Sequence, residues 1–322
     1  MTTAFTFPGQ GSQSVGMGRE IIETYPAAKA VFDEVDNALD QKLSAVIFNG
    51  PDDALTATAN AQPALMAVCI ATMRALEAEG VELKSVASFV AGHSLGEYSA
   101  LAAADALTLA DAAKLLRIRG NAMQAAVPAG EGAMAAIIGL ELDVLETVVQ
   151  DSATLGPCEV ANDNGGGQIV ISGAKSAVEK ACELAKDKGA KRALLLPVSA
   201  PFHSSLMQPA AEAMQEALES TVIYQPKVPL LANVTVAPLT EPAHIRQSLV
   251  DQVTGQVRWR ESIEWFGANG VDTLLEVGSG KVLSGLARRI DRSLTSMPIN
   301  TPEDVQAVAA KLTGAPPPER LP

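Results

Sequence analysis

The chain of 322 residues is long enough for one large domain or for a domain that carries an insertion. Apolar residues make up 48% and aromatic residues only 4%, so the core must be built from Ala, Val, Leu and Ile, which suits helices packed on a parallel sheet. The formal net charge of −13 would repel a phosphate backbone and an anionic lipid surface, so we expect neither nucleic acid nor a membrane as a partner.

The first part of the chain follows an α/β pattern. The elements expected in chain order are a strand over 4–7, a helix from about 17, a long helix over 62–80, a strand over 85–91, and helices over 98–106 and 109–126. The strand over 85–91 is followed at once by a sharp turn and a helix, a succession typical of α/β folds.

The middle of the chain has a different rhythm. The elements expected there are a strand over 132–140, a helix over 142–151, strands over 158–161 and 168–173, a helix over 178–188 and a strand over 191–198. This βαββαβ order is the ferredoxin-like pattern. We therefore expect residues 127–198 to form a small ferredoxin-like domain, inserted into a larger hydrolase-like domain built from 1–126 and 199–313.

The last part returns to the α/β pattern. The elements expected are a helix over 206–219, a strand over 228–232, a helix end at 248–252, a strand over 273–276 and then a basic helix. The tail, 314–322, contains three consecutive prolines and is expected to be disordered.

Two further features of the sequence bear on its cellular setting. The first 13 residues show neither a basic segment nor an apolar run, so no signal peptide is expected. The three cysteines, Cys69, Cys158 and Cys182, show no paired spacing. A reducing cytoplasm is therefore the expected location.

The chemistry centres on a G-x-S-x-G pattern at residues 92–96. The pattern lies between a buried strand and a helix, as a nucleophile elbow requires, and the crowded turn should accept only glycine at both flanking positions. This geometry would expose the hydroxyl of Ser94 and place the amide of Leu95 at a helix N-terminus, where it can donate to an oxyanion. The alternative is an ordinary glycine-capped turn between a strand and a helix.

A serine needs a base, and the chain has three histidines. The side chain of His93 should point away from the neighbouring serine, and His244 lies in a Pro-Ala-His stretch with no glycine or apolar context. His203 follows a predicted strand in a loop, where active-site residues of α/β folds gather, so it is the candidate base. The acceptor for its other ring nitrogen is left open between Asp251, Asp272 and a backbone carbonyl.

Four short motifs occur in order along the chain: P-G-Q-G-S-Q at 8–13, G-H-S-L-G-E at 92–97, R-G at 119–120 and P-F-H-S at 201–204. Together they resemble the malonyl-CoA:acyl-carrier-protein transacylases of fatty acid synthesis, and the resemblance runs from residue 4 to about 312. It implies transfer of a malonyl group from malonyl-CoA to the thiol of an acyl carrier protein by a ping-pong route.

The resemblance also implies the roles of the catalytic residues. Ser94 would carry the acyl group as an ester, and His203 would act first as base and then as acid. The backbone amides of Gln10 and Leu95 would form the oxyanion hole. The main-chain carbonyl of Gln252 would orient the histidine in place of a triad acid.

Substrate contacts follow from the same resemblance. Arg119 would pair with the free carboxylate of the malonyl group, Asn162 would line the cleft from the small domain, and Phe202 resembles the malonyl-selective pattern. Arg119 lies on an otherwise apolar helix, and a buried guanidinium is costly without a carboxylate, which the substrate could supply. The residue pattern alone leaves this role open beside a solvated arginine or an internal salt bridge.

Several hypotheses stay open beside this one. A serine esterase or thioesterase would use the same elbow, and a binding protein with a degenerate site is a third possibility. No metal site, no cofactor and a monomer are expected. A basic patch should dock the acidic carrier protein and the phosphates of coenzyme A, the candidates being Lys186, Lys188, Lys191 and Arg192, or Arg288, Arg289 and Arg292.

Overall fold

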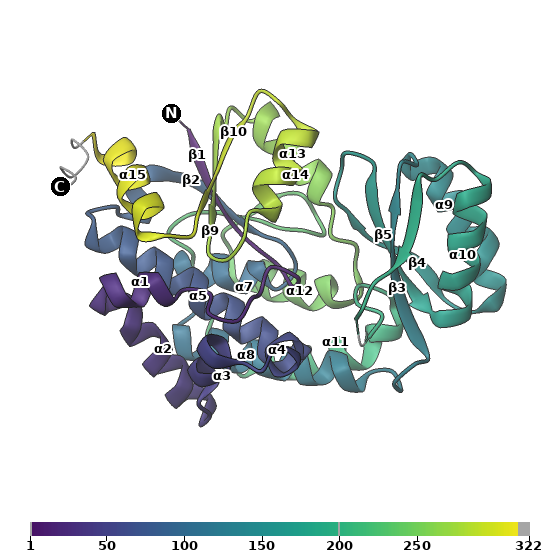
Figure 1. Cartoon of the computed structure of the whole chain (residues 1–322), viewed down its shortest axis with the longest axis horizontal. Coiled ribbons are helices and arrows are strands. Elements are labelled where there is room, and N and C mark those ends of the chain that lie inside the picture. The colour runs from purple at the N-terminus through teal and green to yellow at the C-terminus, as the bar shows by residue number, and fades with distance from the viewer. Residues whose placement is uncertain (1, 199, 315–322) are drawn as a thin grey trace.

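The computed structural model describes residues 2–198 and 200–314 and contains two sheets, each with its own helices (Figure 1). The larger sheet has the order β10-β9-β1-β2-β7-β8. Its strands are β1 (Thr3–Phe7), β2 (Ala87–Gly92), β7 (Leu230–Leu231), β8 (Pro238–Leu239), β9 (Thr273–Val277) and β10 (Thr295–Ile299). All neighbours pair in parallel except β7 and β8, which are antiparallel, so the sheet is mixed rather than purely parallel.

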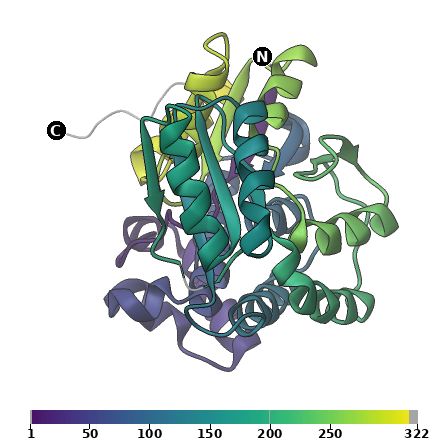
Figure 2. The same cartoon turned by 90° about the vertical axis from the view of Figure 1, so that its right-hand side faces the viewer.

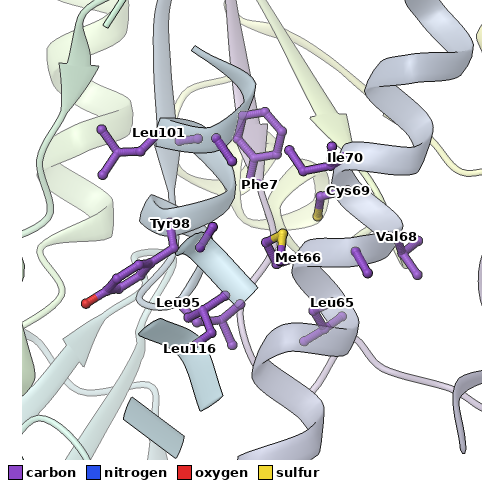
Figure 3. Packing of buried hydrophobic residues seen from close by; sticks show 14 of the residues in the cluster. Phe7, Leu65, Met66, Val68, Cys69, Ile70, Leu95, Tyr98, Leu101 and Leu116 are labelled. Carbon is purple, nitrogen blue, oxygen red and sulfur yellow. The ribbon is translucent and has the colours of Figure 1, made fainter. Parts of the chain in front are cut away.

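Helices surround this larger sheet. They are α1 (Arg19–Thr24), α2 (Pro26–Leu39), α3 (Leu43–Asn49), α4 (Asp52–Thr56), α5 (Thr58–Ala78), α6 (Leu83–Val86), α7 (Gly96–Ala103), α8 (Leu109–Ala125), α11 (Gln208–Glu219), α12 (Pro242–Thr254), α13 (Trp259–Ala268), α14 (Val282–Ile290) and α15 (Pro302–Thr313). Helix α5 is buried along most of its length, and Figure 3 shows its residues Leu65, Met66 and Cys69 packed near Leu95 and Tyr98. The turn after β2 is therefore supported from below by a dense aliphatic core.

The smaller sheet is antiparallel, with the order β4-β5-β3-β6. Its strands are β3 (Gly132–Ile138), β4 (Cys158–Asp163), β5 (Gln168–Ala174) and β6 (Arg192–Leu195). Helices α9 (Leu142–Ser152) and α10 (Lys175–Asp187) lie side by side over one face of it (Figure 2). The strand and helix order is the βαββαβ order expected from the sequence, and the face under the helices has a hydrophobic cluster of its own.

The two sheets are tied together beside the loop that follows β4. The amide of Val257, in the larger part, donates to the carbonyl of Ala161, and the amide of Asp163 donates to the carbonyl of Val257. The carboxylate of Asp163, only 2% exposed, accepts a bond of 2.7 Å from the guanidinium of Arg260 on α13. These contacts fix one end of the small sheet against the larger part.

The structure also shows elements that the sequence patterns did not predict. Helices α13 and α15 and the edge strand β10 were missed. Helix α5 begins at Thr58, earlier than expected, and contains Pro63, which has no N–H to donate to the carbonyl of Ala59 one turn before it. The basic helix α14 ends at Ile290, so Arg292 lies beyond it. Helix α15 is capped by Gly314, and the rest of the expected disordered tail lies outside the described residues. No helix in the described ranges is long and apolar enough to cross a bilayer.

Candidate active site

The turn after β2 has the geometry of a nucleophile elbow. Ser94 adopts a left-handed backbone, with φ of 53°, between two tightly enclosed glycines. A Cβ on Gly92 would lie 1.8 Å from the carbonyl carbon of Gly96, and a Cβ on Gly96 would lie 2.2 Å from the carbonyl oxygen of Phe7. No side chain fits at either position, which agrees with the glycine requirement inferred from the sequence.

Asn233, just after β7, holds this strained turn from the neighbouring strand. Its side-chain oxygen accepts the N–H of Ser94 at 2.8 Å, and its side-chain nitrogen donates to the carbonyl of Gly92 at 2.7 Å. The residue is fully buried. The amide next along the chain, that of Leu95, has no acceptor among the hydrogen bonds of the described residues, so it is free to donate into the pocket.

His203 lies beside the serine, as expected. Its Nε2 is 2.7 Å from the Ser94 Oγ. Its Nδ1 is 2.8 Å from the carbonyl oxygen of Gln252 and 3.1 Å from that of Gly255, a pair of acceptors that fixes Nδ1 as the protonated nitrogen. Of the three acceptors left open by the sequence, only the backbone carbonyl is near the ring: Asp251 and Asp272 are exposed and bonded elsewhere.

The environment of His203 keeps its imidazole neutral. Burial, and then the positive charge of Arg119, lower the pKa of His203 from 6.5 to about 3, although the carbonyl of Gln252 acts in the opposite direction. With Nδ1 bonded to carbonyls, the free lone pair is on Nε2, which faces the serine hydroxyl. A neutral imidazole in this tautomer can take the hydroxyl proton.

Arg119, on α8, enters the same site with its side chain buried. Its Nη1 donates to Gln62 Oε1 at 2.8 Å, and its Nη2 donates to Gln252 Oε1 at 2.8 Å and to Ser94 Oγ at 3.1 Å. Its Nε–H has no acceptor, and no salt bridge among the described residues includes it. The ring of Tyr98 lies 5.8 Å from its guanidinium carbon. The structure thus has a desolvated cation beside the serine that lacks a carboxylate partner, a group that a substrate carboxylate would complete.

Glu97 and Gln252 form a second layer of buried polar groups. Glu97 is completely buried and accepts bonds from the main-chain N–H of Asn233 at 2.6 Å and from Gln252 Nε2 at 2.5 Å. Gln252 Nε2 also donates to the carbonyl oxygen of Ser94 at 2.9 Å. Burial raises the pKa of Glu97 to about 8, against the lowering effect of these two donors and of Arg119.

A pocket of about 380 Å³ opens above these groups, between the two sheets. Its lining includes Gln10 and Leu95 on one side of the serine and Asn162 on β4 of the small sheet. The side chain of Gln10 donates to Thr58 Oγ1 at 3.2 Å, and its main-chain N–H has no acceptor among the hydrogen bonds of the described residues. Apolar residues from both parts complete the lining: Met123, Met134, Val170, Leu196, Val198, Phe202, Val282, Leu283 and Leu286.

A family model described as the acyl transferase domain matches residues 4–303. The chain belongs to this family. A curated relative from Bacillus subtilis, named malonyl CoA-acyl carrier protein transacylase, is 49% identical over 304 residues, which is 94% of this chain and 95% of the relative. The family resemblance drawn from the four motifs is confirmed.

Solved structures agree over nearly the whole chain. An acyl-carrier-protein-S-malonyltransferase from Bartonella henselae superposes with a TM-score of 0.96 at 59% identity, covering 97% of this chain and 100% of that one. A chain from the structure of a malonyl-transacylase in complex with its type II PKS acyl-carrier protein superposes with a TM-score of 0.93 at 38% identity. The match covers 98% of this chain and 100% of that one. The α/β architecture with a second, antiparallel sheet is therefore that of the acyltransferase family.

The side chain of His93 was expected to point away from Ser94. Its ring lines the same pocket and is bonded through Nε2 to Asn164 Oδ1 at 2.9 Å, with the ring of Trp259 5.5 Å away. It makes no hydrogen bond to Ser94 among those described. Because Asn164 follows β4 across the pocket, His93 joins the two parts of this acyltransferase instead of facing the interior of one.

Other polar residues of the site were missed by sequence reasoning. They are Gln62, Glu97, Asn164 and Asn233. Glu97 was part of the quoted G-H-S-L-G-E motif but received no role, and Gln62 was noted only as a helix start. Asn164 lies between the strands expected over 158–161 and 168–173 and received no role, and nothing in the sequence around Asn233 distinguishes it. Each acquires its partner from a distant segment, which periodicity cannot reveal.

Proposed function

We propose that this acyltransferase moves a malonyl group from malonyl-CoA to the thiol of an acyl carrier protein, in fatty acid synthesis. The observation that carries the proposal is the buried Arg119, which has no carboxylate partner in the described part of the chain and whose Nη2 lies 3.1 Å from Oγ of the candidate nucleophile Ser94. The names of the relatives support the same substrate class. The Ser94–His203 pair supplies the covalent chemistry, and Arg119 supplies recognition of the free carboxylate.

In the first half-reaction, the Oγ of Ser94 attacks the thioester carbonyl carbon while its proton passes to Nε2 of His203. The negative charge that develops on the carbonyl oxygen is taken up by the main-chain amides of Gln10 and Leu95. The carbon–sulfur bond then breaks, the imidazolium returns its proton to the sulfur of coenzyme A, and a malonyl-Ser94 ester remains.

In the second half-reaction, the thiol of the carrier protein enters the same pocket. His203 takes the thiol proton, the sulfur attacks the ester carbonyl carbon, and the ester bond to Ser94 breaks with return of the proton to its Oγ. The carbonyls of Gln252 and Gly255 hold the ring in one tautomer and stabilise the imidazolium in both halves, which is the task of the acid in a triad.

The finer architecture belongs to the proposal as well. We assign residues 1–126 and 199–313 to a hydrolase-like domain with the nucleophile elbow, and residues 127–198 to an inserted ferredoxin-like domain. The strand order of each sheet and the separate hydrophobic cluster of the smaller one support this division. Asn162 would then contact substrate from the inserted domain.

The three cysteines are free and buried, which supports the proposed location in a reducing cytoplasm. That the protein is a monomer stays a prediction.

Two basic patches remain candidates for docking the carrier protein. The patch on α14 borders the pocket, since Val282, Leu283 and Leu286 of this helix belong to the lining. Reversal of charge at Arg288 and Arg289 should raise the KM for the carrier protein. It should also raise the KM for malonyl-CoA, because the same patch is expected to bind the phosphates of coenzyme A. A KM that stays unchanged after reversal of both patches would exclude this part of the proposal.

The experiment that tests the proposed function is intact-protein mass spectrometry after brief exposure to malonyl-CoA, with acetyl-CoA in parallel. We expect an increase by one malonyl group that disappears in Ser94→Ala and is small with acetyl-CoA. Arg119→Ala should slow the loading of malonyl. The expected loss of transition-state stabilisation is about 2–5 kcal/mol, the cost of removing one partner of a desolvated ion pair. Steady release of free coenzyme A without an adduct would instead identify a thioesterase, and no reaction at all would favour a binding protein.

A further inference from the structure

Glu97 is a buried carboxylate that the proposed reaction does not use. It is 0% exposed, and no lysine, arginine or histidine lies within salt-bridge distance of it among the described residues. Both of its oxygens accept N–H bonds, one from the Asn233 main chain and one from the Gln252 side chain. Neither oxygen has an acceptor for a carboxyl proton among the hydrogen bonds of the described residues, so these contacts satisfy the ionised form even though burial raises the pKa of Glu97 to about 8. An ionised carboxylate is costly to bury.

The amide of Gln252 stands between Glu97 and Arg119. Its Nε2 donates one N–H to Glu97 and the other to the carbonyl of Ser94, and its Oε1 accepts from Arg119 Nη2. A carboxylate can only accept and a guanidinium can only donate, so the amide has one permitted orientation. If it were flipped, its oxygen would face two acceptors and its NH₂ group would face a donor.

We propose that Glu97 is a positioning residue for carboxylate recognition: it fixes the amide of Gln252, and this amide in turn aims the guanidinium of Arg119 at the acyl pocket. The inference rests on the proposed function, because it takes Arg119 as the receptor of the malonyl carboxylate. The aligned amide also directs the negative end of its dipole at Arg119, and this stabilises a guanidinium that has no salt bridge among the described residues.

A simpler role for Glu97 would be support of the elbow alone, because it lies in the first turn of α7. That role predicts an equal loss for every acyl donor, whether or not the donor has a carboxylate. The positioning role predicts a selective loss for malonyl. The ratio of malonyl to acetyl loading at Ser94 therefore separates the two.

The experiment compares pre-steady-state loading of full-length protein from malonyl-CoA and acetyl-CoA, quenched and read by intact mass. The variant is Glu97→Gln, which keeps the size of the side chain but cannot accept at both ends. We expect the malonyl-to-acetyl ratio to fall about tenfold, the worth of a hydrogen bond to a charged group. The matched control is Asn233→Ala, which releases the elbow but keeps the main-chain N–H that Glu97 accepts. Both of its rates should fall while the ratio stays within about twofold of wild type.

Gln252→Leu removes the side-chain amide that links Glu97 to Arg119. This variant tests the positioning role even if Glu97→Gln does not fold. Its ratio should fall as in Glu97→Gln, and the double variant should fall no further, because the two residues act through one path. Equal losses of malonyl and acetyl loading in Glu97→Gln, a ratio that rises, or a wild-type ratio in Gln252→Leu would each overturn the inference.

The proposed function is judged separately in the same assay. If wild type acquired no malonyl group, or if Arg119→Ala kept the wild-type ratio, the carboxylate site itself would be wrong. A loss of the ratio in Arg119→Ala together with an unchanged ratio in Glu97→Gln would reject only the role of Glu97.

Discussion

Ser94 and His203 both adopt left-handed backbone conformations, with φ of 53° and 56°, in a chain where only five described non-glycine residues do so. Such conformations cost free energy and persist only where surrounding contacts impose them. At Ser94 the contacts come from Asn233, and at His203 from the carbonyls of Gln252 and Gly255. The strain is therefore concentrated at the two residues to which the proposed reaction assigns proton transfer and nucleophilic attack.

Burial of neutral His203 makes a prediction about stability against pH. Its pKa is lowered from 6.5 to about 3 in the folded protein, so between these values the unfolded chain binds the extra proton. The stabilising contribution is complete above the unfolded pKa and is lost as the pH falls toward the folded one. At about pH 5, this residue alone should cost about 2 kcal/mol of the free energy of unfolding.

Urea unfolding of wild type and His203→Gln, at neutral pH and at about pH 5, measures this contribution. The variant should lose about 2 kcal/mol less than wild type over the same pH interval, because the other titrating groups are common to both. Equal losses would contradict the neutral, buried state of the imidazole.

At the scale of elements, the site depends on how closely β1, β2 and α7 approach one another. The helix begins within two residues of Ser94, and the carbonyls of Phe7 and Pro8 lie against Gly96. Leu95 and Tyr98, which follow the turn, belong to the same buried hydrophobic cluster as residues of α5 (Figure 3). This packing restricts movement of the turn away from β1. A glycine at each flank is thus a packing requirement as well as a conformational one.

Gly92→Ala tests this packing. The new methyl group would meet the backbone of Gly96 at 1.8 Å, so we expect a loss of at least about 3 kcal/mol in the free energy of unfolding, or failure to fold. The matched control is Gly285→Ala on α14, where an added Cβ meets nothing within 4 Å; it should be neutral or stabilising by up to about 1 kcal/mol. Thermal and urea unfolding would show both, and a Gly92→Ala protein as stable as the control would refute the crowding.

At the scale of the whole molecule, the pocket exists because two separately built sheets are held at a fixed separation. One side of the pocket comes from loops of the larger part, and the other from β4, β5 and the segment 196–198. The tie at Asp163 and Val257 joins the strand that carries Asn162 to the chain leading into α13. The proposed contact of Asn162 with substrate therefore depends on a few polar contacts that lie outside the proposed catalytic residues.

Arg260→Ala would leave the buried carboxylate of Asp163 without its cation. We expect a loss of about 1–3 kcal/mol in the free energy of unfolding, below the cost for a fully buried pair because Arg260 is 32% exposed, together with a raised KM for malonyl-CoA. Glu264→Gln removes the other, exposed partner of the same arginine and should change stability by no more than about 0.5 kcal/mol. Hydrogen exchange of the β4 amides would report the loosening, and unchanged protection in Arg260→Ala would contradict the tie.

The sequence by itself determined the parts that depend on local pattern. Strand, glycine-flanked turn and helix around Ser94 follow from short-range sterics, and the βαββαβ order of 127–198 follows from hydrophobic periodicity. His203 could be selected as the candidate base because the chain has so few histidines. Arg119 could be noted as a cation on an otherwise apolar helix. The resemblance of four motifs then supplied roles that the individual residues could not.

Only the tertiary structure decided which polar groups meet. The hydrogen-bond partners at the candidate site lie far along the chain: Ser94 is 109 residues from His203 and 139 from Asn233, and Glu97 is 155 from Gln252. The orienting group for His203 is a main-chain carbonyl, which every residue possesses and which no side-chain pattern can mark. Local sequence sets the conformation of each segment, but the identity of a buried hydrogen-bond partner is fixed by the packing of distant segments, where leaving a group unpaired is costly.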